Sequence, residues 1–239
     1  MDREHGTVVF PGMNFDPSIA AIIDHTILKA DAARPQVLAA CEEALRFGFA
    51  AVCVNSFWVP LVARELRGSP VKVCTVAGFP LGAASTHAKV AEVLAAIRDG
   101  AVEIDMVMNI GALKGKETAV ASSDIKAIVA ATHAHGAIVK VIIETALLER
   151  DEKIAACRLA RDAGADFVKT STGFASSGAT ADDLTLMRKT VGPAMGVKAS
   201  GGIRSLEELR AMVAAGANRV GASASVHIME QTAMSRAAT

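Results

Sequence analysis

The fold is decided by a short pattern that recurs along the chain, and its fullest copy is GADFVKTSTG at residues 164–173. A glycine ends a helical stretch, an apolar run with β-propensity follows, and the run ends in hydroxyl side chains and a second glycine. The same opening occurs as GFA at 48–50, GAV at 100–102 and GAN at 216–218. Steps of 52, 64 and 52 residues separate these glycines, which is about two strand–helix units per step.

Apolar runs alternate with helical stretches over the rest of the chain. Residues 18–23 are predicted to be a short helix that runs into the first strand, with Asp24, His25 and Thr26 at that strand's carboxyl end. Seven more strands are expected at 50–54, 71–76, 102–108, 138–143, 166–169, 197–199 and 219–223, and helices at 35–45, 60–66, 86–98, 117–135, 151–163, 182–190, 206–215 and 225–235.

The tally of these elements predicts an α/β fold, a single (β/α)8 TIM barrel at residues 18–239 behind a short N-terminal extension at residues 1–17. Strands that are apolar on both faces belong to a parallel sheet covered by helices, and eight such units in about 220 residues is typical of this barrel. A doubly wound open sheet is the alternative. No G-x-G-x-x-G pattern follows the first strand, which disfavours it.

Composition excludes several classes of partner. Lys+Arg and Asp+Glu both number 25, so no net charge favours nucleic acid or an anionic membrane as the partner. The N-terminus has no apolar segment behind a basic start, and no uncharged apolar run of about 18 residues occurs. The four cysteines have no C-x-x-C spacing, which is typical of free thiols in a reducing compartment. We therefore expect a cytoplasmic enzyme.

Two lysines lie in strand-like apolar runs. Lys169 lies within the stretch quoted above, and Lys198 follows 29 residues later in GVKASGG at 196–202. Burying an ammonium costs several kcal/mol unless the group is paired or loses its proton. A lone lysine at a strand end can simply extend its head group to water. Two of them on adjacent strands favour a nucleophilic amine that forms a Schiff base with a carbonyl, because burial and a second positive charge favour the neutral form.

Two carboxylates lie in one predicted strand, one layer apart. Asp105 lies in the fourth predicted strand, where it is either a salt-bridge partner of Lys72 or Lys140 or a proton shuttle between the two lysines and a substrate. Glu103 lies two residues earlier on the same face and is read as structural, paired with one of those lysines. The expected strand ends carry Asp24, Asn55, Thr75, Asp105, Glu144, Lys169, Lys198 and Ser223.

Two glycine-rich turns predict an anion site. SGG at 200–202 follows the seventh strand and GAS at 221–223 follows the eighth. Backbone N–H groups of such turns bind phosphate, and barrels place phosphates at these two loops. Thr172 and Gly173 are expected to complete the site.

No metal or cofactor is predicted. No set of histidine, cysteine and carboxylate has a ligand spacing typical of a metal site. Cys53 and Cys74 are interpreted as small core residues.

These motifs together resemble the deoxyribose-phosphate aldolase family over residues 24–223. The resemblance rests on DHT at 24–26, VCVN at 52–55, EIDMV at 103–107, DFVKTSTG at 166–173, VKASGGIR at 197–204 and GAS at 221–223. It implies a barrel that needs no metal and cleaves 2-deoxyribose 5-phosphate reversibly to acetaldehyde and glyceraldehyde 3-phosphate, in deoxyribose catabolism.

The resemblance also implies roles for single residues. Lys169 would form the Schiff base, Lys198 would perturb it and help to move protons, and Asp105 would donate or accept a proton. Asp24 would contact a hydroxyl or a water. The phosphate would be bound by Gly173, Gly201, Gly202, Gly221 and Ser223.

One feature departs from the family. Some members end in a tyrosine that reaches the site, and this chain contains no tyrosine. Any proton step of such a tail must here use Asp105, Lys198 and water.

The remaining alternatives are a different Schiff-base aldolase or an isomerase acting on a phosphosugar, and a barrel that binds a sugar phosphate without turnover. A homo-oligomer, dimer or tetramer, is expected.

Overall fold

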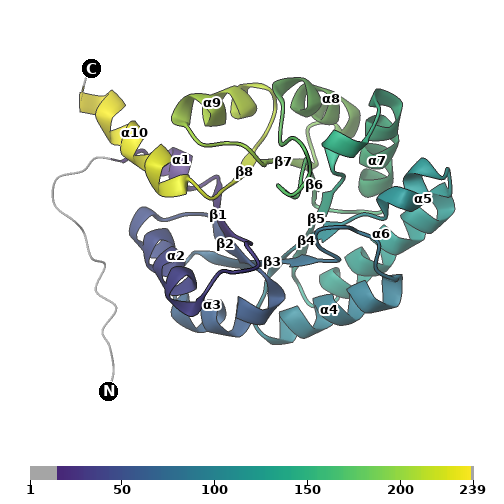
Figure 1. The fold of residues 1–239 in the computed structure, drawn as a ribbon, viewed down its shortest axis with the longest axis horizontal. Helices are drawn as coiled ribbons and strands as arrows, with labels where there is room; N and C mark the ends of the chain where they lie inside the picture. The colour runs from purple at the N-terminus through teal and green to yellow at the C-terminus, as the bar shows by residue number, and fades with distance from the viewer. Residues whose placement is uncertain (1–14, 238–239) are drawn as a thin grey trace.

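The computed structural model describes residues 15–237 of the chain, so most of the expected N-terminal extension at residues 1–17 lies outside the described residues. Eight parallel strands close a barrel in sequence order (Figure 1). They are β1 (Ile23–Ile27), β2 (Ala51–Val54), β3 (Lys72–Ala77), β4 (Glu103–Val107), β5 (Ile138–Ile142), β6 (Phe167–Lys169), β7 (Gly196–Ser200) and β8 (Arg219–Ala222). The closed barrel confirms the predicted fold, and the open-sheet alternative is wrong.

Helices surround the barrel on its outside (Figure 1). They are α1 (Pro17–Ala20), α2 (Arg34–Phe47), α3 (Val59–Glu65), α4 (Thr86–Arg98), α5 (Ile110–Lys114), α6 (Thr118–His133), α7 (Arg150–Asp162), α8 (Ala181–Val191), α9 (Leu206–Ala214) and α10 (Ser225–Ala237), with 3₁₀ turns η1 (Ser56–Trp58) and η2 (Thr145–Leu147). The chain ends of the barrel meet where the Asp16 backbone N–H donates to Thr232 of α10 over 3.1 Å.

The first strand differs from the prediction. The helix α1 ends at Ala20, and Asp24, His25 and Thr26 lie inside β1 instead of at its carboxyl end. Parallel pairing with β8 extends the strand at its start, because Asp24 aligns with Gly221. The short helix α5 was not predicted. Its first turn is fixed by Asn109, whose side chain accepts a hydrogen bond from the Ala112 backbone N–H.

Apolar packing falls into two regions. The larger one fills the space between strands and helices, as in Ile104, Val139 and Val168, all fully buried. The smaller one lies on the β2 and β3 side of the barrel interior and contains Leu28, Ala51, Cys53, Cys74 and Val76, with Phe79 against it. The interior also contains buried charged side chains, so an ionic cluster lies beside an apolar wall. Within the described residues, no helix is both long and apolar enough to cross a membrane.

A buried ion pair holds two of the outer helices together beside β4. Lys89 of α4 donates to Asp124 of α6 and to the Val107 carbonyl oxygen, over 2.7 and 2.8 Å. Both side chains are almost fully buried. A Cβ at Gly78 would lie 2.7 Å from Lys89 Cε, so glycine there leaves room for the lysine stem.

The change Lys89→Met is expected to lower the free energy of unfolding by about 3–5 kcal/mol, because it leaves Asp124 buried without its cation. Urea unfolding followed by circular dichroism measures this. The control is Lys126→Met at an exposed position of α6, where less than about 0.5 kcal/mol is expected. Equal stability of the two variants would contradict a structural role for the pair.

Candidate active site

The barrel interior holds an ionic cluster drawn from six strands. Its cations are Lys140 (β5), Lys169 (β6), Lys198 (β7) and Arg219 (β8), and its carboxylates are Asp24 (β1), Glu103 and Asp105 (both β4). Parallel pairing places Lys169 directly beside Lys198. The two predicted lysines and the predicted aspartate are therefore in direct contact.

Asp105 lies at the centre of the cluster. Its Oδ2 accepts hydrogen bonds from the Nζ atoms of Lys169 and Lys198, both over 2.7 Å. Its Oδ1 accepts from Lys140 Nζ over 2.8 Å and from Cys74 Sγ over 3.3 Å. One fully buried carboxylate thus serves three ammonium groups. The sequence had offered Lys72 or Lys140 as a salt-bridge partner, and Lys140 is the one found.

Glu103 and Asp24 are the other two carboxylates of the cluster. Glu103 pairs with Lys140 over 2.6 Å and with Arg219 over 2.9 Å, which confirms its structural reading. Asp24 accepts a hydrogen bond from Arg219 Nε over 2.6 Å and from Lys198, and it has no exposed surface. Asp24 is thus a buried partner of two cations, and its expected contact with a substrate hydroxyl or water stays a prediction.

The field inside the barrel keeps Asp24, Asp105 and Lys198 charged. Burial alone would raise the pKa of Asp24, but Lys198, Lys140 and Arg219 outweigh burial and lower it to about 2. Burial would also raise the pKa of Asp105, but Lys140, Lys169 and Lys198 outweigh burial and hold it well below its usual range. Burial would lower the pKa of Lys198, but Asp105 and Asp24 raise it well above its usual range. Lys198 is consequently a fixed positive charge beside Lys169.

The loop after Lys169 is tied to neighbouring strand ends. Thr170 Oγ1 donates to the Ser200 carbonyl oxygen and accepts from the Ser200 backbone N–H, over 3.1 and 3.0 Å. The Thr172 hydroxyl donates to Glu144, and the Thr172 backbone N–H lies 3.2 Å from the same carboxylate. Glu144 is buried and has a positive φ of 55°, an uncommon backbone conformation outside glycine. Thr172 therefore orders the loop through Glu144.

The predicted phosphate residues fall into two groups. Gly173 and Gly201 meet closely, since a Cβ at Gly201 would lie 3.6 Å from Gly173 Cα. Gly201 and Gly202 have φ values of 85° and 82°, the left-handed region that favours glycine. Ser223 is exposed after β8. These four residues are placed at the ends of β6, β7 and β8.

Gly221 has a different environment. It lies inside β8, and a Cβ there would lie 3.1 Å from Lys198 Cε and 3.3 Å from Ser200 Cβ. Glycine at this position leaves room for the lysine stem, and the expected contact of Gly221 with phosphate stays a prediction.

Aromatic side chains stand over the same end of the barrel. Phe79, after β3, and Phe174, after β6, pack edge to face with ring centroids 5.3 Å apart. Phe174 is 56% exposed. Together they place an apolar rim over the apolar wall of the interior.

A separate cavity of about 490 Å³ lies at the opposite end of the strands. Arg64, Arg67 and Arg98 surround it near the C-terminal ends of α3 and α4 and the start of β3. The three arginines lie beside carbonyl-rich helix ends, which basic side chains stabilise. The cavity is lined by none of the charged groups of the barrel interior.

Sequence reasoning missed two cations of the site. Lys140 was considered only as a possible partner of a carboxylate, and Arg219 was not singled out. Both lie in predicted strands, where a buried charge is itself a signal. Four charged residues were expected at the carboxyl ends of their strands. Lys169 is the last residue of its strand, but Asp24, Asp105 and Lys198 lie within theirs.

Comparison with known proteins agrees with this geometry. The family model described as DeoC/LacD family aldolase matches residues 18–229. The chain belongs to the DeoC/LacD family of aldolases. The aldolase is 57% identical over 213 residues to a protein named deoxyribose-phosphate aldolase from Halalkalibacterium halodurans, and the match covers 89% of this chain and 95% of the relative. A protein of the same name from a Geobacillus strain is 54% identical with the same coverage.

Solved structures agree with the sequence matches. The aldolase superposes with a TM-score of 0.85 on a structure described as the unique tetrameric structure of deoxyribose phosphate aldolase from Aeropyrum pernix. Sequence identity is 32%, and 90% of this chain and 92% of that chain are covered. The barrel fold and the enzyme class inferred from the sequence are thus confirmed.

Acid should weaken the aldolase through Asp24. Because the pKa of Asp24 falls from 3.8 to about 2 on folding, its contribution to stability is complete above about pH 4 and is lost as the pH falls through 2. This contribution is roughly 2 kcal/mol. Urea unfolding between pH 6 and pH 2 should therefore show a smaller acid loss in Asp24→Asn than in the wild type. Asp31→Asn, at an exposed position, is the control and should follow the wild type. Parallel pH curves for Asp24→Asn and wild type would contradict the assignment.

Proposed function

We propose that this aldolase cleaves 2-deoxy-D-ribose 5-phosphate reversibly to acetaldehyde and D-glyceraldehyde 3-phosphate through a Schiff base on Lys169, in deoxyribose catabolism. Two observations support the proposal. The relatives at 54–57% identity are named deoxyribose-phosphate aldolase. The barrel also gathers three lysines around one buried carboxylate, Asp105.

One observation selects Lys169 as the nucleophile. Lys140 pairs with Glu103 and Lys198 pairs with Asp24, each in addition to Asp105. Among the described residues, Asp105 is the only carboxylate that pairs with Lys169, and Lys169 shares it with the other two lysines. Lys169 is also the last residue of its strand, with a side chain that keeps 3% exposure where those of Lys140 and Lys198 have none. Its ammonium is the least compensated of the three and the nearest to solvent.

Charge balance points the same way. Four cations and three carboxylates leave an excess of one positive charge when all seven groups are ionised. A low-dielectric interior disfavours that excess, and loss of one proton removes it. Lys198 is held charged by two carboxylates, which leaves Lys169 as the lysine for attack on a carbonyl.

The reaction then follows from the groups around Lys169. Its amine adds to the C1 aldehyde of the open-chain sugar, and loss of water gives an iminium. The C3 hydroxyl gives up its proton as the C2–C3 bond breaks, which releases glyceraldehyde 3-phosphate, and the electron pair moves into the iminium to form an enamine. Protonation of the enamine at C2 and hydrolysis release acetaldehyde and restore the amine. Asp105 is ionised and contacts both lysines, so it serves as proton acceptor, directly or through water, with Lys198 as a fixed positive charge beside it.

The phosphate is expected at the ends of β6, β7 and β8. The loops of Gly173 and of Gly201 and Gly202 lie against each other there, and Ser223 lies just before α10. Backbone N–H groups and the positive end of that helix suit an anion. A phosphate at this place leaves the aldehyde end of the sugar toward Lys169.

Residues 18–239 are proposed to act as one catalytic domain, in the cytoplasm, as a homodimer or homotetramer. The family match over residues 18–229 supports the first point. All four cysteines are buried free thiols, as a reducing compartment allows. The tetrameric description of the Aeropyrum pernix structure supports a homo-oligomer.

Acetaldehyde release from 2-deoxyribose 5-phosphate, measured with an alcohol dehydrogenase coupled assay, tests the reaction. Lys169→Ala should lose at least about a thousandfold in kcat, because no other amine is placed to form the iminium. The matched control is Lys189→Ala, at an exposed position of α8, which should keep wild-type rates.

Two outcomes would contradict the proposal. A wild-type enzyme that cleaves fructose phosphates but not deoxyribose 5-phosphate would favour a different Schiff-base aldolase. Binding of deoxyribose 5-phosphate by wild type and by Lys169→Ala, with no acetaldehyde from either, would favour a binding protein.

A further inference from the structure

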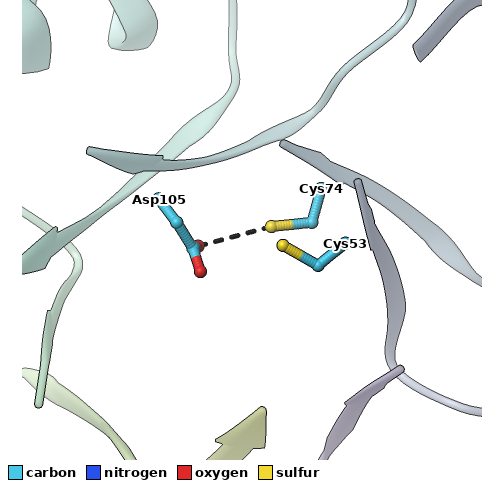
Figure 2. A group of neighbouring side chains, drawn as sticks. All are labelled: Cys53, Cys74 and Asp105. Carbon is cyan, nitrogen blue, oxygen red and sulfur yellow. Dashed lines mark hydrogen bonds between the residues drawn. The ribbon is translucent and has the colours of Figure 1, made fainter. Parts of the chain in front are cut away.

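Two thiols share the barrel interior with the ionic cluster and have no part in the proposed reaction. Cys53 of β2 and Cys74 of β3 are paired in register on neighbouring strands, and both have no exposed surface. Figure 2 shows their sulfur atoms side by side and facing Asp105. They belong to the apolar wall of the interior, so the wall ends in two sulfurs against the central carboxylate.

The three side chains have the separation and chemistry of metal ligands. Cys74 Sγ lies 3.3 Å from Asp105 Oδ1, and the two sulfurs and a carboxylate oxygen all lie within 4.8 Å of one another. Ligand bonds of about 2.3 Å to sulfur and about 2.0–2.2 Å to oxygen place the donors of one tetrahedral zinc about 3.3–3.8 Å apart. Lys140 Nζ lies 2.8 Å from Asp105 Oδ1 and 3.4 Å from Cys74 Sγ, so a metal ion has to displace this ammonium as the three side chains close around it. Sequence spacing does not reveal this set, because its members come from three strands.

We propose that Cys53, Cys74 and Asp105 form a binding site for a thiophilic divalent cation such as Zn²⁺ or Cd²⁺, and that occupancy of the site inhibits the enzyme. The inhibitory part rests on the proposed function. The site is separate from catalysis in its chemistry, since the reaction proposed above uses no metal.

Loss of the two thiol protons balances the charge of a divalent cation in the interior. Thiolates are the form that binds metal, so two thiol protons leave as a divalent cation enters, and the net charge of the interior does not change. A cation that entered without displacing protons would add two positive charges to the interior. Two sulfurs and one oxygen also favour Zn²⁺ and Cd²⁺ over Mg²⁺ or Ca²⁺, which prefer oxygen ligands.

Inhibition follows from the position of Asp105. Its two oxygens now serve three lysines, with Lys140 and Cys74 on Oδ1 and Lys169 and Lys198 on Oδ2. A metal ion on Oδ1 competes with Lys140 and draws the carboxylate toward β2 and β3. Lys169 then loses its partner, and the proton acceptor of the reaction is occupied.

Cadmium titration of the full chain tests the site, with a phosphine reductant present to keep the thiols reduced. The expected result is one Cd²⁺ per chain, an ultraviolet sulfur-to-cadmium charge-transfer band, and a parallel loss of aldolase activity that a chelator reverses. Cys53→Ala and Cys74→Ala should each need at least about tenfold more Cd²⁺ for half inhibition, relative to their own metal-free rates. Circular dichroism checks that both variants are folded. Cys41→Ala is the matched control, because this buried thiol lies in α2 outside the barrel, and it should titrate as wild type.

Three results would overturn the proposal: no charge-transfer band at saturating Cd²⁺, a band without loss of activity, or equal inhibition of wild type and both variants. The band is read without substrate. A protein that shows the band but releases no acetaldehyde even without metal would contradict the proposed function and leave the metal site standing.

Discussion

The structure depends on one carboxylate shared by three ammonium groups in the dry interior of the barrel. Asp105 bonds to Lys140, Lys169 and Lys198, and each bond is 2.7 or 2.8 Å long. Replacing buried ion pairs by apolar side chains is often neutral or stabilising, so such a cluster is weak evidence for stability. Its arrangement is better explained by chemistry, because incomplete compensation singles out one lysine.

The remaining parts of the barrel maintain that unequal sharing. Asp24 pairs with Lys198 and Arg219, and Glu103 pairs with Lys140, so each of these two lysines has a carboxylate partner besides Asp105. Gly221 leaves space for the Lys198 stem. The register between β6 and β7 then places Lys198 beside Lys169, the last residue of β6.

Sequence alone predicts much of this, because each βα unit is locally marked. Glycines mark the ends of the helices and apolar runs mark the strands. A lysine within an apolar run indicates a functional site, because burying its charge is costly. The first strand was misplaced because the polar residues Asp24, His25 and Thr26 were taken for its carboxyl end, although pairing with β8 places Asp24 and His25 inside the strand. The contact between Cys53, Cys74 and Asp105, and the double engagement of Arg219, depend on register between strands distant in sequence. No local pattern specifies that register.

The central claim is that unequal sharing of Asp105 makes Lys169, and not Lys140 or Lys198, the reactive amine. Borohydride reduction in the presence of acetaldehyde, followed by peptide mass spectrometry, tests it most directly. The account predicts a single ethyl adduct, located on Lys169, since reduction of the acetaldehyde iminium leaves two carbons on the amine. An unmodified Lys169 peptide, or an adduct on Lys198 or Lys140, would contradict it.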